Sequence, residues 1–97
     1  MAERAKKKTD YAALQSPFMR IPGMAIPAAR GLLDVGLREV YELSGRSPET
    51  LWEDLRKAKP DAPRDLLPFF RLAVYFAENG TDADPKKLTP AAWQNPS

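Results

Sequence analysis

A short stretch of this chain combines a tight turn with the start of a helix, an arrangement that can hold a phosphate group. Pro22-Gly23 predicts the turn, because proline fixes φ at the second turn position and glycine adopts the positive φ of the third. The helix is predicted from about Ile26 to Val35. A helix start presents backbone N–H groups and the positive end of the helix dipole, and both attract anions. We therefore expect backbone contact with a phosphate at Gly23, Met24, Ala25 and Ile26.

Two arginines and a lysine run supply positive charge for the same contact. Arg20 precedes the turn and Arg30 follows it, so we expect both guanidinium groups to flank the phosphate. Lys6, Lys7 and Lys8 lie in a polar amino-terminal arm, where each phosphate that they neutralise would release counterions and strengthen binding at low salt. The alternative is that the lysines only solubilise the chain and that the turn simply joins two packed helices.

The residues around the turn follow the order typical of a helix-hairpin-helix unit. That order is apolar-Pro-Gly-apolar-Gly, followed by an alanine and a leucine at helical spacing. The chain follows it from Ile21, except that Ala25 stands where the second glycine is expected. Glycine at that point lets a backbone or a phosphate approach closely, and alanine does so less freely. The replacement therefore bears on the function of the hairpin and not on its fold.

The spacing of apolar residues predicts an all-α fold, a compact bundle of about five short helices that contains the helix-hairpin-helix unit. A length of 97 residues allows one domain with a small core. We expect residues 1–13 to form a basic flexible arm, residues 14–93 to form the helical domain, and residues 94–97 to be frayed.

Two of the predicted helices carry clear packing signals. One begins at Ser47-Pro48, where the serine hydroxyl can accept a backbone N–H, and it places Trp52 on its core face. The other covers residues 66–77 and is apolar on nearly all sides, which predicts a helix buried among the others. We expect Arg71, the only charge within it, to pair with a carboxylate of a neighbouring helix, and Trp93 to fold back onto the domain.

The net charge of +2 is spread unevenly along the chain. Residues 1–20 carry five Lys/Arg against two Asp/Glu, whereas the remaining residues carry ten Lys/Arg against eleven Asp/Glu. Dedicated nucleic-acid binders usually carry a basic face. We therefore expect the arm to supply most of the attraction to a polyanion.

Several function classes are excluded by composition, because the chain contains no cysteine and no histidine. Disulfides, thiolate nucleophiles, thiolate zinc sites and imidazole general bases are therefore ruled out. We expect no enzymatic activity, no metal and no cofactor. The apolar runs are too short for a membrane span and the polar amino terminus is unlike a secretory signal, which predicts a soluble, cytoplasmic protein without a membrane partner.

Residues across most of the chain also form a pattern seen in a known family. They are Ile21-Pro22-Gly23-Met24-Ala25, Ala29, Leu32, Val35-Gly36-Leu37, Val40, Leu43, Gly45-Arg46-Ser47-Pro48-Glu49, Leu51 and Phe70–Ala77. In this order they resemble a small bacterial family whose members are labelled pathogenicity locus or mitomycin resistance proteins and are described as helix-hairpin-helix-like. The resemblance covers roughly residues 14–93, and it implies the fold without implying an established chemistry. Members usually have glycine in place of Ala25 and more tryptophans near the carboxyl end, where this chain has Trp93.

These patterns predict a non-catalytic binding module that contacts the DNA backbone, independently of base sequence, through the hairpin of residues 21–30. The alternative is a protein–protein adaptor or a small homodimer in which the hairpin is only structural. In that case we expect an exposed apolar patch that includes Phe18, Met19 or Trp52. A positive concavity around the hairpin would favour DNA, and an apolar ridge would favour a partner chain.

Overall fold

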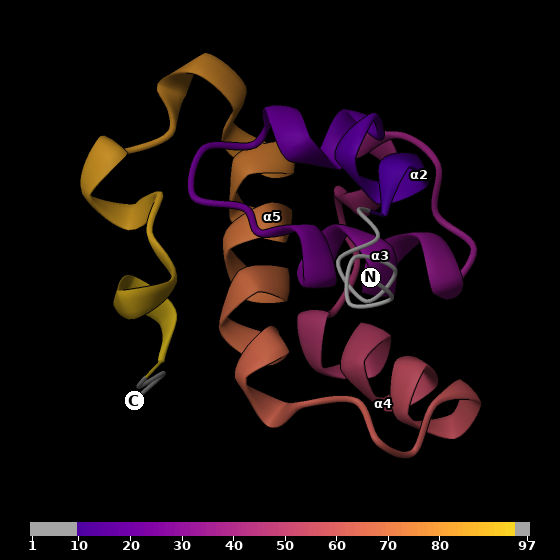
Figure 1. Cartoon of the computed structure of the whole chain (residues 1–97). Helices are drawn as coiled ribbons and strands as arrows, with labels where there is room; N and C mark the ends of the chain where they lie inside the picture. Colours follow the sequence, from indigo (N-terminus) through magenta and orange to yellow (C-terminus); the bar gives the residue numbers. More distant parts are fainter. Residues whose placement is uncertain (1–9, 95–97) are drawn as a thin grey trace, which may run out of the picture.

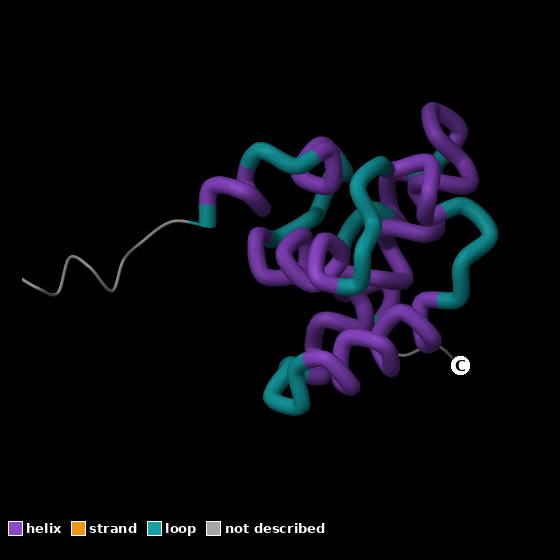
Figure 2. Tube along the Cα trace, turned by 90° about the vertical axis from the view of Figure 1, so that its right-hand side faces the viewer, coloured by secondary structure: helices purple, strands orange, loops and turns teal. Residues whose placement is uncertain are grey.

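A computed structural model describes residues 10–94 of the protein. This range contains helices and turns and no strand (Figure 2). The α-helices are α2 (Tyr11–Leu14), α3 (Ile26–Asp34), α4 (Pro48–Ala58) and α5 (Leu67–Asn79), and the 3-10 helices are η1 (Pro17–Arg20), η2 (Val40–Leu43), η3 (Arg64–Leu66), η4 (Gly80–Asp82), η5 (Pro85–Lys87) and η6 (Pro90–Trp93). The predicted all-α fold is confirmed. The predicted count of about five helices is not, because the described residues form four α-helices and the other short segments adopt single 3-10 turns.

Helix α5 is the element around which the rest of the described chain packs. In Figure 1 it runs through the middle of the molecule, with α3 and α4 on one side and the C-terminal segment on the other. Phe70, Leu72 and Ala73 on α5 are fully buried. The predicted buried helix is therefore confirmed, since α5 has neighbours on both sides and apolar residues to meet each of them.

The core draws on every α-helix and on the turns between them. Its buried apolar residues are Ala13, Phe18, Ile21, Ala28, Ala29, Leu32, Leu37, Leu43, Leu51, Trp52, Leu55, Leu66, Phe70, Leu72, Ala73 and Val74. No helix that the structure describes is long and apolar enough to cross a membrane.

Phe18, Met19 and Trp52 do not form the exposed patch expected for the adaptor alternative, and the predicted core position of Trp52 is confirmed. The side chain of Phe18 is fully buried, and Met19 packs against the core from the same turn. Trp52 is only 7% exposed. Its indole N–H donates to the Pro63 carbonyl at 3.3 Å, and the Arg56 guanidinium lies 4.9 Å from its ring centre, so neighbouring groups cover it.

Helix α2 places the start of the packed chain before the predicted boundary at residue 14. The Asp10 carboxylate accepts the Ala13 N–H at 3.2 Å and so caps the helix. Ala13 itself is fully buried, because α2 packs on α3. Residues 11–13, predicted to be part of the flexible arm, therefore belong to the domain. Three candidate binding residues of the arm lie outside the described part of the chain: Lys6, Lys7 and Lys8.

Residues 80–94 form a segment that we call the C-terminal strap, and it follows one side of α5 (Figure 1). As predicted, Trp93 folds back onto the domain, with its ring centre 5.4 Å from that of Tyr75. Arg71 donates to the Trp93 carbonyl at 2.7 Å and forms an ion pair with Glu49 of α4 at 3.1 Å. The predicted ion pair of Arg71 with a neighbouring helix is thus confirmed, and the same guanidinium also holds the strap.

Candidate functional site

The hairpin turn has the predicted backbone geometry. Gly23 adopts φ +84, and the Met24 N–H donates to the Ile21 carbonyl at 3.2 Å, which closes the turn. Ile21 is buried and anchors the turn in the core. The Met24 amide therefore already has an acceptor within the turn, so it differs from the free amide expected at this position.

Helix α3 begins directly after the turn and has no side-chain cap. Ala25 occupies the N-cap position with φ −120 and ψ 154, and its carbonyl accepts the Ala29 N–H at 3.0 Å. Within residues 10–94, the backbone N–H groups of Ala25, Ile26 and Ala28 have no acceptor, and Pro27 has no N–H. Because Ala28 is fully buried, the start of α3 presents two accessible unpaired donors, those of Ala25 and Ile26, which an anion or water can satisfy.

The tip of the hairpin lies against the C-terminal strap. A Cβ added to Gly23 would lie 2.5 Å from the Leu88 carbonyl oxygen and 3.1 Å from Leu72 Cδ1. Only glycine fits this contact, because any larger residue would collide with backbone atoms and would also require a positive φ. The close approach that glycine permits is thus used by the protein's own backbone.

The Arg30 guanidinium is paired with carboxylates and is not a free charge beside the turn. It forms two hydrogen bonds of 2.7 Å with the Asp10 carboxylate and one of 3.3 Å with Asp34, which also lies 2.6 Å from the Lys59 ammonium. These contacts join α2, α3 and the end of α4. The hydrogen bonds from Arg30, followed by that from the Ala13 amide, lower the pKa of Asp10 to about 2, and the same carboxylate raises the pKa of Arg30. The Arg30 charge is therefore balanced locally.

Arg20 keeps the exposed position expected of a flanking cation. It ends η1 just before the turn, its side chain is exposed, and no carboxylate lies within 4 Å of it among residues 10–94. Of the two predicted arginines, Arg20 is thus the one whose charge is available beside the hairpin.

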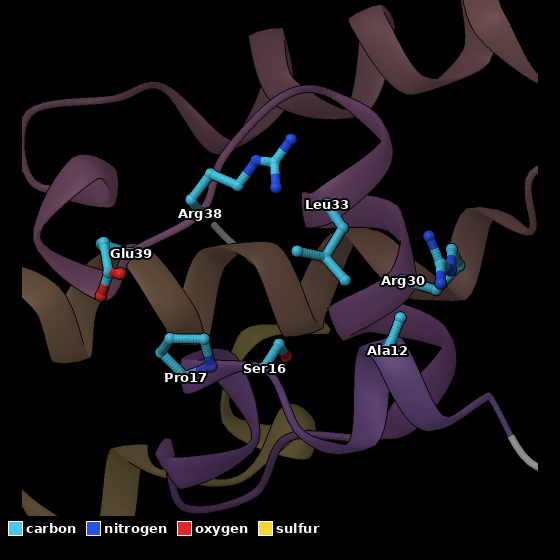
Figure 3. A pocket seen from close by; sticks show the side chains of 7 residues that line it. All are labelled: Ala12, Ser16, Pro17, Arg30, Leu33, Arg38 and Glu39. Carbon is cyan, nitrogen blue, oxygen red and sulfur yellow. The ribbon is translucent and has the colours of Figure 1, made fainter.

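Figure 3 shows a hollow beside α3 that the sequence did not reveal. Its volume is about 420 Å³, and it is lined by Ala12, Ser16, Pro17, Arg30, Leu33, Arg38 and Glu39. Leu33 lies between Arg30 and Arg38 in this view, so apolar and cationic groups share the wall. The segment that carries Arg38 is held by Glu42, whose carboxylate accepts the N–H groups of Arg38 and Glu39 at 2.6 and 2.9 Å. These two hydrogen bonds lower the pKa of Glu42.

Three large apolar side chains are exposed on α2 and η2. Tyr11 and Leu14 of α2 are 64% and 41% exposed, and Tyr41 of η2 is 74% exposed. The sequence could have indicated that Tyr11 and Leu14 lie together, since residues three apart share a helix face. Within residues 10–94, no three acidic side chains gather closely enough to hold a metal ion.

Comparison with known proteins found no match: no family model, no curated protein and no solved structure is similar to this chain. Function is therefore inferred from the residues and their geometry.

Proposed function

We propose that this protein is a non-catalytic binding module in which α2–η1, the Pro22-Gly23 turn and α3 act as a helix-hairpin-helix unit that contacts the DNA backbone. The observation that carries the proposal is the uncapped start of α3, where the partly exposed Ala25 and Ile26 have backbone N–H groups with no acceptor among the described residues. Together with the helix dipole, these donors are suited to one phosphate oxygen. Such contacts position a protein on DNA without reading its bases.

The geometry narrows the predicted set of phosphate contacts. The Met24 N–H donates to the Ile21 carbonyl, and the Arg30 guanidinium is paired with carboxylates, so we assign neither group to phosphate binding. Ala25 and Ile26 remain as amide donors, and Arg20 remains as the exposed cation. Neutralisation of one phosphate by the Arg20 charge contributes a slope of roughly −0.9 to the plot of log affinity against log salt.

The test is a salt titration of duplex DNA binding by the parent protein and by Ala25→Asp. An aspartate at the N-cap accepts the N–H groups of the first turn and repels phosphate, so we expect binding to fall and the salt slope to lose roughly one contact, or about 0.9. The matched control is Ser47→Asp, which adds the same charge at the start of α4. That start is already capped by the Ser47 hydroxyl, so we expect the control to bind as the parent does.

The two variants separate a local effect from a change in net charge. Equal loss of binding in Ala25→Asp and Ser47→Asp would show that only net charge matters and would remove the hairpin from the interface. No detectable binding by the parent at low salt would reject the DNA proposal.

A protein-interaction role is the second candidate, supported by the exposed side chains of Tyr11, Leu14 and Tyr41. Exposed aromatic and aliphatic groups of this kind are enriched where proteins meet. Sedimentation across a concentration series tests the homodimer, because Tyr11→Ser should lower the average mass of an associating protein. A mass that stays monomeric at every concentration contradicts the homodimer.

A further inference from the structure

The C-terminal strap covers the approach to the hairpin tip. The Leu88 carbonyl oxygen contacts Gly23, which lies two residues before Ala25. Successive Cα atoms are about 3.8 Å apart, so the strap lies within roughly two residue lengths of the unpaired donors of α3. A DNA duplex presents two backbones and the grooves between them. A duplex that approaches the start of α3 from the side of Gly23 would therefore contact the strap as well.

Besides the contact of Leu88 with Gly23 and the packing of Trp93 on the core, the strap is held by polar and ring contacts with two α5 side chains. The Asp84 N–H donates to the Tyr75 hydroxyl at 2.7 Å, the Trp93 ring packs on the Tyr75 ring, and Arg71 donates to the Trp93 carbonyl. None of the residues in 80–94 is buried. Segments with little buried apolar surface open locally at low free-energy cost, without unfolding of the rest.

We propose that the C-terminal strap is an autoinhibitory element that competes with the DNA backbone for the hairpin, an inference that rests on the function proposed above. The carbonyl oxygen of Leu88 carries the negative end of a peptide dipole, so it disfavours a phosphate at the tip. DNA binds when the strap leaves α5. The apparent affinity is therefore the affinity of the open form multiplied by the fraction of molecules in which the strap is open.

The strap carries no net charge that would draw DNA to it. Lys86 and Lys87 are balanced by Asp82 and Asp84, so the strap adds no net positive charge beside the hairpin. The Lys87 ammonium lies 5.7 Å from the centre of the Tyr75 ring, where it stabilises the closed strap.

The experiment compares duplex DNA affinity of the full-length parent, Tyr75→Phe and Tyr41→Phe. Tyr75→Phe removes only the hydroxyl that accepts the Asp84 N–H, which should open the strap and raise affinity by up to about five-fold. Tyr41→Phe makes the same chemical change at an exposed tyrosine outside the strap, and its affinity should equal that of the parent. Trp93→Ala, which removes the ring contact, should raise affinity further.

Hydrogen exchange of the parent provides a second readout, because the Asp84 N–H reports directly on docking of the strap. Addition of duplex DNA should speed exchange at Asp84, as reciprocal coupling requires. Slower or unchanged exchange, or equal affinities for Tyr75→Phe and Tyr41→Phe, would overturn autoinhibition while leaving DNA binding in place. Absence of detectable DNA binding by the parent at low salt would instead reject the proposed function and the inference with it.

Discussion

Helices α3 and α4 begin differently, although each has a proline in its first turn. At α4 the Ser47 hydroxyl accepts the Thr50 N–H at 3.2 Å, and Glu49 adds a negative charge to the first turn. At α3 the N-cap is Ala25, which offers no acceptor, and the first turn has no acidic residue. One helix start is thus satisfied within its own segment, while the other is left with unpaired donors.

The difference shows that the start of α3 is less stable than a capped helix start would be. An alanine in place of serine at an N-cap costs about 0.5–2 kcal/mol. Helix α3 tolerates that cost because its other face is well buried, with Ala28, Ala29 and Leu32 fully enclosed. Packing therefore holds α3 in place, and its first turn is available to a ligand.

The largest expected effect tests what holds the hairpin before α3. Gly23→Ala should lower the free energy of unfolding by roughly 1–3 kcal/mol, because the positive φ is strained and the methyl displaces the Leu88 carbonyl, a cost that opening of the strap limits. Gly36→Ala is the matched control, since Gly36 also has a positive φ, +96, but no atom within 4 Å of its added Cβ. Urea unfolding of both variants measures the difference, and equal losses would mean that the contact with the strap contributes nothing.

Removal of the α4 cap should have the next largest effect. Ser47→Ala leaves the Thr50 N–H without its acceptor and should cost about 1 kcal/mol. Ser44→Ala, at an exposed serine outside any helix start, should leave the unfolding midpoint unchanged. If the two serine variants unfold alike, the proposed contrast between the helix starts is lost.

Addition of a cap to α3 should produce a smaller change of opposite sign. Ala25 already has the extended backbone typical of an N-cap, so Ala25→Ser should raise the free energy of unfolding by about 0.5–1 kcal/mol. The added hydroxyl occupies donors that a phosphate would use, so DNA affinity should fall as stability rises. A thermal melt and a DNA titration on the same sample measure both. A cap that stabilises nothing would indicate that these amides already have acceptors.

The smallest expected effect concerns α2, whose start is capped by a charged side chain. The pKa of Asp10 is lowered from 3.8 to about 2, so the unfolded chain binds the proton more readily than the folded one. The stabilisation is therefore complete above about pH 4 and is lost as the pH falls toward 2. Asp10→Asn should remove this part of the acid dependence, with a modest effect because the pair with Arg30 is one-third exposed. Unfolding midpoints across pH 2–5 test it, and identical pH profiles would contradict the ion pair.

Local signals in the sequence were sufficient to predict most of the α-helices. The Pro22-Gly23 turn, the Ser47 cap and the buried α5 each follow from residues within a few positions of one another, and the structure agrees with all three. Such features depend on φ preferences, on hydrogen bonds to the next turn and on apolar spacing, which are properties of short segments. The composition likewise determined that thiol and imidazole chemistry are absent.

Only the tertiary structure decided which candidate groups remain available to a ligand. Arg30 meets Asp10 across a separation of twenty residues, and Gly23 meets Leu88 through the strap. Burial followed the same rule, since Phe18 and Trp52 are covered while Tyr11 is exposed. Each of these outcomes depends on which helix faces pack together, and that is set by the combined free energy of the whole core. A side chain's type states what it can bind, and packing determines whether that capacity is already used within the chain.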